Sequence, residues 1–264
     1  MITIKSKHEI EMMKEAGRIS NLALWTVGQA IRPGITTAEL DKIAEEVILA
    51  NGAKPNFKGY GGFPASICAS VNNVLVHGIP DKKTVLKHGD IISIDTGAIY
   101  KGYNGDNAWT FAVGEVNEKA QKLMDVTLQA LYVGLEQVKP GNRLSDISHA
   151  IGEFVYKNGF TVPYDYTGHG IGTNMHEDPS IPNYGEAGHG PILKEGMCLA
   201  IEPMVHTGKP FTRVLGDGWT VVTKDGSLAG HYEHTVVVTK TGYEILTQCE
   251  ESKEKEWENK MSLR

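Results

Sequence analysis

The spacing of apolar positions predicts two amphipathic helices near the start of the chain, and each carries its own start signal. The first opens at Ser6 and Glu9, which have the spacing of a capping box, and runs to about residue 30. The second opens at Thr36 and Glu39, and its apolar residues recur three or four positions apart as far as residue 48. Short apolar runs follow, with the length and composition of β-strands.

The clearest strand pattern lies at residues 86–109, which read LKHGDIISIDTGAIYKGYNGDNAW and predict a β-hairpin. One arm ends its apolar run on Asp95, the chain turns near residues 100–102, and the other arm carries Asp106. The two carboxylates then lie opposite each other or within a residue or two, with Cβ atoms roughly 5 Å apart if directly paired. Like charges so placed repel each other unless a cation or a shared proton lies between them.

The second half of the chain repeats this plan at positions shifted by 107 residues. A long helix is predicted for about residues 117–138, and Pro140-Gly141 ends it as Pro33-Gly34 ends the first helix. The register holds through the next helical stretch, because Asn51-Gly52 falls on Asn158-Gly159. The chain therefore contains an internal repeat of two helices and a hairpin.

The repeat also places an acid on an acid. At the same shift Asp95 falls on Glu202, and after about 20 additional residues in the second copy Asp106 corresponds to Glu233. We expect these four carboxylates to converge. Removing them from water without a countercharge costs several kcal/mol for each carboxylate. A divalent metal balances that charge. The alternative is that the acids are exposed strand ends in water, but chance does not set four acids at matching positions of a repeat.

One imidazole breaks the symmetry of the two copies. His169 lies within the glycine-rich segment YTGHGIG at residues 166–172, where the first copy has GYGGF at residues 59–63. A lone histidine in such a turn is more often a hydrogen-bonded loop residue. Beside four acids it makes a fifth ligand, a sensible supply for two metal ions that share carboxylates.

The repeat predicts an α+β fold of two α/β halves related by an approximate twofold, whose antiparallel strands merge into one curved sheet with the helices on its outer face. We expect one catalytic domain over residues 1–264, with pseudo-repeats of about 6–115 and 116–246. Residues 247–264 form a charged C-terminal tail, interpreted as a solvated helix or a frayed end.

Composition narrows the setting in which such a protein works. The 264 residues are 41% hydrophobic, enough for a sizeable core, and the net charge of -6 gives no basic face for nucleic acid. The start has no signal-peptide pattern, and no apolar run approaches the ~18 residues of a membrane span. Three cysteines lie far apart in the sequence, which favours a reduced, cytoplasmic setting.

Several motifs spread over nearly the whole chain carry a family resemblance. They are Val76-His77-Gly78-Ile79-Pro80, Ile94-Asp95, Gly105-Asp106, Gly168-His169-Gly170-Ile171-Gly172 followed by His176-Glu177, Ile201-Glu202-Pro203, and Tyr232-Glu233-His234-Thr235. With them the chain resembles the type I methionine aminopeptidases, which have the pita-bread fold; the long helical insertion of type II is missing. The resemblance implies five metal ligands, namely Asp95, Asp106, His169, Glu202 and Glu233.

The resemblance also implies catalytic roles for His77 and His176 in hydrolysis of an amide by a hydroxide that bridges two divalent ions (Co, Mn, Fe or Zn). Glu202 accepts the proton of the water and passes it to the leaving amine. His176 donates to the carbonyl oxygen as it becomes an oxyanion, and His77 holds the scissile amide or its leaving nitrogen. Without the motifs, His77 reads as a strand-end histidine bonded to backbone and His176 as a loop cap. His231, on the strand face of Glu233 if the strand is regular, is expected to support the ligands.

Specificity for methionine requires a narrow apolar pocket for an unbranched thioether side chain. By resemblance the walls of this substrate-binding pocket are Tyr60, Phe63, Cys68 and Trp219, with His77 at the edge and Met175 and His176 nearby. The chain departs from some family members at Phe57, Phe63 and Met175, where those members have Cys, Tyr and Phe; the exchanges keep the pocket apolar. Without the metal ligands this cluster would read as an aromatic core patch.

The predicted partners are the N-termini of nascent polypeptides that begin with methionine and a small second residue; we expect a monomer and leave contact with the ribosome open. Two alternatives remain. One is a prolidase-like Xaa-Pro aminopeptidase, whose relatives usually carry an extra N-terminal domain for which the repeat, beginning near residue 6, leaves no room. The other is a non-catalytic pita-bread binding module, which would lack some of the five ligands.

Overall fold

The structure is a computed structural model that describes residues 1–250, so most of the predicted charged tail, residues 251–264, lies outside the described residues. The helices of the described part are α1 (Lys7–Ala30), α2 (Thr37–Ala50), α3 (Glu118–Leu135) and α4 (Leu144–Lys157). The bounds of α4 are those of α2 plus 107 at both ends, as the repeat in the sequence predicts. None of the helices in residues 1–250 combines the length and apolar character that a membrane span requires.

Both predicted capping boxes are confirmed. At the start of α1 the Ser6 hydroxyl accepts from the Glu9 N–H, and the Glu9 carboxylate accepts from the Ser6 N–H at 2.7 Å. At the start of α2 Thr36 and Glu39 make the same exchange. These bonds satisfy backbone donors that a helix N-terminus otherwise leaves unpaired, which is why the local sequence sets the helix starts.

The strands of the described residues alternate with loops through both halves. They are β1 (Lys54–Pro55), β2 (Ile67–Val71), β3 (Val74–Val76), β4 (Ile91–Tyr100), β5 (Tyr103–Ala112), β6 (Gly168–Gly170), β7 (Glu177–Ile181), β8 (Cys198–Ile201), β9 (Met204–His206), β10 (Thr212–Val214), β11 (Val221–Thr223), β12 (Ala229–His231), β13 (His234–Val238) and β14 (Tyr243–Ile245). A single turn of 3₁₀ helix spans Tyr60–Gly62. All pairings among these strands are antiparallel, which confirms the α+β class.

The β4–β5 hairpin has the predicted turn. Tyr100 pairs with Tyr103, and both residues between them have positive φ, 48° at Lys101 and 87° at Gly102, as a two-residue type I′ turn requires. In this register Asp95 lies opposite Ala108, and Asp106 lies opposite Gly97. The two aspartates are therefore diagonal neighbours, two residues apart along the ladder and on the same face of the sheet.

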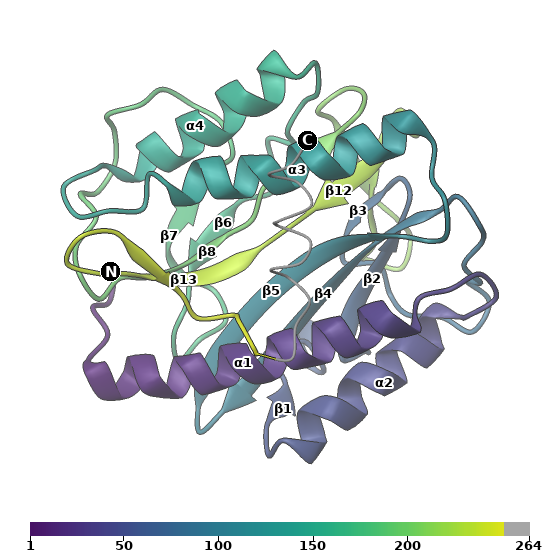
Figure 1. Ribbon diagram of the computed structural model, residues 1–264, viewed down its shortest axis with the longest axis horizontal. Helices are drawn as coiled ribbons and strands as arrows, with labels where there is room; N and C mark the ends of the chain where they lie inside the picture. Colours follow the sequence, from purple (N-terminus) through teal and green to yellow (C-terminus); the bar gives the residue numbers. More distant parts are fainter. Residues whose placement is uncertain (251–264) are drawn as a thin grey trace.

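Among the described residues, the strands pair into sheets of four, three, two and five strands. The four-stranded sheet holds the β4–β5 hairpin, and β5 contacts the second half of the chain. Ala108 of β5 exchanges backbone hydrogen bonds with Glu233, and the Thr235 hydroxyl donates to the Asp106 carbonyl at 2.8 Å. In Figure 1, α1 and α2 lie below the strands and α3 and α4 above them, and the two further views keep the strands between the two helix pairs.

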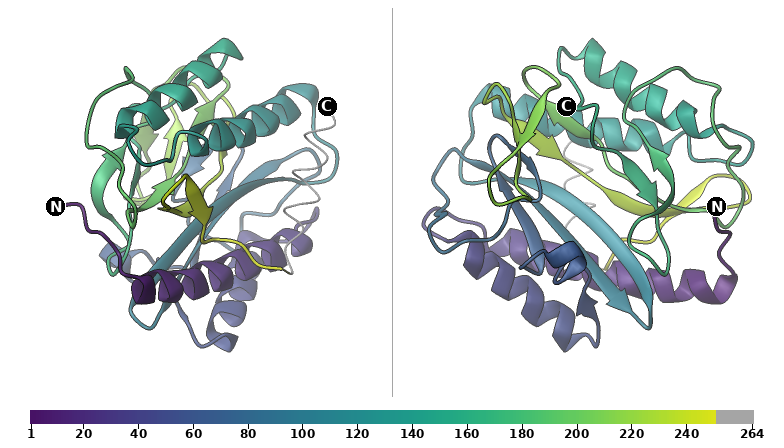
Figure 2. Two further views of the ribbon diagram at one scale, coloured as in Figure 1. Left: turned by 60° about the vertical axis from the view of Figure 1, so that its left-hand side comes forward. Right: turned by 180° about the vertical axis from the view of Figure 1, so that it is seen from behind.

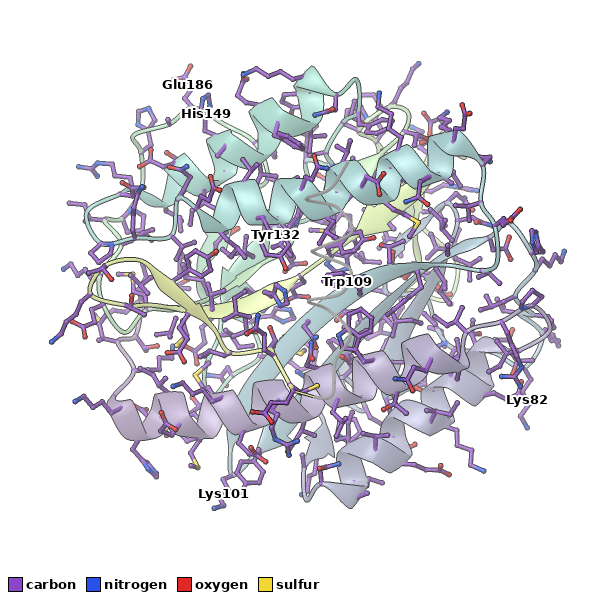
Figure 3. All side chains as sticks on the ribbon, viewed as in Figure 1. Lys82, Lys101, Trp109, Tyr132, His149 and Glu186 are labelled. Carbon is purple, nitrogen blue, oxygen red and sulfur yellow. The ribbon has the colours of Figure 1, made fainter. Side chains whose placement is uncertain are left out.

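One apolar core joins the two halves. The Trp109 ring of β5 lies 5.4 Å from Trp25 of α1 and 4.9 Å from Tyr232, measured between ring centroids. Figure 3 shows Trp109 in the interior of the molecule, with Tyr132 of α3 above it, whereas labelled charged residues such as Lys82 lie at the periphery. The helices thus cover the outer side of the strands, and the side chains described next lie on the other side.

Candidate metal centre and active site

The five predicted ligands line one cavity of about 390 Å³. Each comes from a different part of the fold, with Asp95 on β4, Asp106 on β5, His169 on β6, Glu202 directly after β8, and Glu233 between β12 and β13. The remaining predicted site residues line the same cavity: Tyr60, Phe63, Cys68, His77, Met175, His176 and Trp219. The structure therefore brings together every site residue expected from the sequence.

The ligand-capable atoms of the site form two overlapping groups. In one group, atoms of Asp106, His169 and Glu233 all lie within 4.8 Å of one another, and in the other the same holds for Glu202, His231 and Glu233. Glu233 belongs to both groups, and Asp95 lies beside Asp106 in the hairpin register. Side chains from both halves thus face one small volume.

Burial makes these acids unusual. Burial raises the pKa of Asp106 to about 7. Burial, together with neighbouring carboxylates, holds the pKa of Asp95, Glu202 and Glu233 well above the usual range. One oxygen of each of Asp95, Asp106 and Glu233 is buried without any hydrogen-bond donor among the described residues. Unpaired buried carboxylate oxygens are costly, and a divalent cation is a partner that removes the cost at every one of them. The residues therefore fit a metal site.

His169 is prepared as a neutral ligand. Its Nδ1 lies 2.9 Å from the Gly170 carbonyl oxygen, which can only accept, so Nδ1 carries the proton and Nε2 presents a lone pair. Burial, reinforced by His176, lowers the pKa of His169 to about 4. The Nε2–Glu202 Oε1 contact of 3.5 Å is therefore not an ion pair at neutral pH.

Steric contacts explain why the residues on both sides of His169 are glycines. A Cβ at Gly168 would lie 2.5 Å from the Ala200 carbonyl oxygen, and one at Gly170 would lie 2.0 Å from that of Asp178. Only glycine lets β6 fit between β7 and β8.

His176 lies against the metal-ligand candidates and the aromatic wall at once. Its Nδ1 is 2.8 Å from the Tyr60 hydroxyl, and its ring centroid is 4.3 Å from that of His169. Burial lowers its pKa, so the ring is neutral at pH 7. Two anchors hold the loop before it, since the Asn104 amide donates to the Gly172 carbonyl at 3.0 Å and the Glu177 carboxylate accepts from the Asn174 N–H at 3.1 Å.

His77 follows β3 in a conformation that few non-glycine residues adopt, with φ of 58°. Its ring lies 6.3 Å from Trp219 and 6.2 Å from Tyr166 between centroids. Burial, followed by repulsion from the protonated form of His176, lowers the pKa of His77 to about 4. Backbone strain at a cavity-lining residue is typical of a functional position.

The pocket walls are aromatic and sulfur-bearing. Phe63 packs edge-on against Trp219 at 5.2 Å and against Phe57 at 6.5 Å, and Cys68 and Met175 complete the same buried cluster. The cluster borders the carboxylates directly, since the same cavity is lined by both sets. An apolar side chain can therefore lie beside the charged centre.

Sequence reasoning missed several lining residues: Val76, Asp165, Tyr166, Thr167, Met204 and, as a member of a ligand group, His231. Some of these had a signal, because Tyr166 and Thr167 directly precede the GHG motif and Met204 lies two residues after Glu202. Asp165 had none, because its approach to the cavity depends on how the loop before β6 folds.

Comparisons with known proteins agree with this geometry. The sequence model of metallopeptidase family M24 matches residues 11–240. A methionine aminopeptidase from Clostridium acetobutylicum is 55% identical over 250 residues, which cover 95% of this chain and 100% of that protein. The crystal structure of a methionine aminopeptidase from Thermotoga maritima matches with a TM-score of 0.93 and 48% identity, covering 94% of this chain and 100% of the other.

A more distant likeness is to the prolidase from Pyrococcus furiosus, with a TM-score of 0.77 and 29% identity over 94% of this chain and 66% of the prolidase. The fold is thus the pita-bread fold that both kinds of enzyme share. The family match spans both halves of the repeat and all five acid and histidine positions described above. The chain therefore belongs to metallopeptidase family M24.

Proposed function

We propose that the chain is a methionyl aminopeptidase, which removes the N-terminal methionine from nascent proteins and peptides whose second residue is small. The observation that carries the proposal is the position of five metal-ligand candidates beside aromatic side chains that line the same cavity of about 390 Å³. The relatives with the highest identities reported above bear the name methionine aminopeptidase, and the match covers the full length of each.

The proposed centre takes two divalent ions of Co, Mn, Fe or Zn, held by Asp95, Asp106, His169, Glu202 and Glu233. Carboxylates outnumber imidazoles in this set, which suits ions that accept oxygen ligands rather than those that need thiolate. When bound, the ions lower the pKa of a bound water and polarise the substrate carbonyl. The native ion depends on supply in the cell.

Three side chains have separate roles in the proposed hydrolysis. Glu202, which lines the cavity, accepts a proton from the attacking water and returns it to the leaving amine. The Tyr60 hydroxyl lies 2.8 Å from Nδ1 of His176. We propose that this hydroxyl donates to Nδ1, so that the proton of the ring is on Nε2, where it stabilises the developing oxyanion. His77, fixed at the pocket edge, holds the scissile amide or its leaving nitrogen.

Selectivity for methionine comes from the pocket walls. Phe63 and Trp219 leave an apolar slot beside Cys68 and Met175, where a flexible thioether packs well against aromatic rings and sulfur. Tyr60 and His176 stand at the same cavity, so a bulky second residue would strike them. We propose that this contact limits substrates to those with a small second residue.

We propose that residues 1–264 act as one catalytic domain, with pseudo-repeats of about 6–115 and 116–246, and as a monomer in the cytoplasm. Cys68 and Cys198 are buried free thiols, as suits a reducing compartment. We propose nascent N-termini as the partners, without direct binding to nucleic acid or membrane; the net charge of -6 offers no general attraction to anionic surfaces.

A peptide assay tests the proposal against its nearest alternative. The likeness to a prolidase keeps an Xaa-Pro aminopeptidase as the second candidate. With Co²⁺ or Mn²⁺ added, we expect release of methionine from Met-Ala-Ser and little turnover of Ala-Pro-Ser or Met-Leu-Ser. Preferred cleavage of Ala-Pro-Ser would replace the proposal with the second candidate, and no cleavage of any peptide would favour a binding module.

A further inference from the structure

The two groups of ligand-capable atoms each contain one imidazole, and only one of the two was expected as a ligand. His169 is in the group with Asp106, and His231 is in the group with Glu202, while Glu233 is common to both. Six side chains, rather than five, therefore face the space in which two ions are proposed to bind. The sixth is His231.

His231 has the features of a ligand rather than of a packing residue. Its side chain is 2% exposed, and its Nε2 is buried without a hydrogen-bond partner among the described residues. The Nε2 lies 3.3 Å from Glu202 Oε2 and 3.9 Å from Glu233 Oε2, and neither contact has hydrogen-bond geometry. A buried ring nitrogen that faces two carboxylates without bonding to either one is well placed for a cation between them.

The backbone holds this ring in place from both sides. The His231 N–H donates to the Thr110 hydroxyl at 3.0 Å, and the Thr110 hydroxyl donates to the His231 carbonyl at 2.9 Å. On the other side β12 pairs with β9, where His231 lies opposite Met204. The position of the ring is thus set by β5 and β9, and a metal ion would not need to reorganise the strand.

We propose that His231 is a sixth metal ligand, which gives the ion shared by Glu202 and Glu233 a nitrogen donor of its own. This inference rests on the proposed function, because it places His231 in the same two-ion centre. Each ion would then receive one imidazole, from His169 on one side and His231 on the other. With six ligands, the two ion sites would have more similar donor atoms than they would with five.

The sixth ligand changes which ions the centre prefers. Imidazole strengthens binding of Co²⁺ and Zn²⁺ more than of Mn²⁺, whose preference is for oxygen donors. With His231 as ligand, the second ion should therefore discriminate more strongly for Co²⁺ over Mn²⁺ than carboxylates alone would allow.

Titration calorimetry on chelator-stripped protein tests the proposal without any peptide. In wild type titrated with Co²⁺ we expect two binding events, and in His231→Gln we expect one of them to weaken by about 10- to 100-fold while the other is kept. With Mn²⁺ the loss should be smaller. The matched control is His206→Gln, because His206 is also buried and its Nε2 also has no partner within residues 1–250, but it lies on β9 outside the cavity. It should bind Co²⁺ as wild type does.

A second measurement covers the case in which His231→Gln fails to fold. X-ray absorption of wild-type protein loaded with two Zn²⁺ counts imidazole scatterers, and we expect one per ion. A count of one imidazole for two ions, or a His231→Gln isotherm equal to that of the His206→Gln control, would overturn the proposal. Failure of the proposed function would show separately, as absence of methionine release by the loaded wild type.

Discussion

At the scale of single residues, the proposed metal chemistry follows from buried carboxylate oxygens that have no hydrogen-bond donor among the described residues. The Asp106 side chain is 3% exposed, and its Oδ1 has no hydrogen-bond partner among the described residues. Its backbone, in contrast, is fully engaged, since the N–H donates to the Thr235 hydroxyl and the carbonyl accepts from it. The position is thus held by the main chain, while the charge is left for a ligand.

Replacing Asp106 by asparagine separates charge from shape. The amide has nearly the same volume, and the backbone bonds to Thr235 are kept, so the circular dichroism spectrum should be that of wild type. Because a ligand charge is lost, we expect metal affinity to fall by at least about tenfold, and methionine release at limiting metal to fall with it. Glu11→Gln, an exposed change on α1, serves as the control. Wild-type turnover in Asp106→Asn would remove this residue from the ligand set.

His176 is the residue on which oxyanion stabilisation depends in the proposed mechanism. Its replacement by alanine should lower kcat for a Met-Ala peptide by about 100- to 1,000-fold, the usual loss for one oxyanion donor. KM should change little, because the apolar pocket binds the substrate side chain independently. An exposed histidine, His189, provides the control His189→Ala, with wild-type kinetics expected. An unchanged kcat in His176→Ala would show that another group faces the oxyanion.

At the scale of elements, local signals in the sequence predicted the helices well and the short strands poorly. The starts of α1 and α2 were predictable because capping boxes act within four residues. Strands such as β9, β11 and β12 are three residues long, and their pairing partners are distant in sequence. Nothing in a three-residue segment specifies such a partner, so their positions follow only from the assembled fold.

The candidate site also contains residues that could be predicted from the sequence and residues that could not. The four acids were predictable from the repeat, because matching positions of two similar halves meet at the axis between them. The walls of the pocket were reached by resemblance alone, since Phe63, Met175 and Trp219 come from loops with no periodic pattern. Asp165 was not predicted, because its place beside the cavity depends on tertiary folding of one exposed loop.

The segment before α1 is held by side-chain contacts with Glu177. The Lys5 ammonium lies 2.6 Å from Glu177 Oε2, and the two side chains are only 6% and 11% exposed. The same carboxylate accepts from the Thr3 hydroxyl, and Glu177 directly follows His176. The N-terminal segment is thereby tied to the loop that carries His176, the proposed oxyanion donor.

Breaking this tie should affect the reaction as well as stability. In Lys5→Met the Glu177 charge is left buried without its partner, which costs about 3 kcal/mol of unfolding free energy. We expect kcat to fall more than KM rises, because the loop before β7 loosens around His176 while the pocket walls stay in place. Chemical denaturation and steady-state kinetics measure the two effects.

The control for this change is Lys14→Met, which removes ion pairs with Glu244 and Glu11 at the surface of α1. Exposed pairs contribute less than about 1 kcal/mol, so stability and kinetics should stay near wild type. Arginine at position 5 should restore part of kcat, since it keeps the charge. A Lys5→Met protein that is less stable but has wild-type kcat would show that the tie is structural only.

At the scale of the whole molecule, the proposed metal ligands lie where the two halves meet. Asp95 and Asp106 come from the first half, and His169, Glu202 and Glu233 come from the second. The halves also share the core around Trp109 and Tyr232, so they do not depend on metal to associate. Ions bound between them should nonetheless add a link that the unfolded chain cannot make.

Removal of metal should therefore lower the unfolding temperature without unfolding the protein. At a metal concentration 100 times Kd, binding to the folded state alone adds about 2.7 kcal/mol. For a chain of this size each kcal/mol corresponds to roughly 2 °C, so excess chelator should lower Tm by about 5 °C. Calorimetry of wild type with metal and with chelator measures the difference. In Asp106→Asn the difference should shrink, because less metal is bound at the same concentration. An equal Tm with and without metal in wild type would mean that the five side chains bind no ion in the folded protein, and the proposed chemistry would then lack its centre.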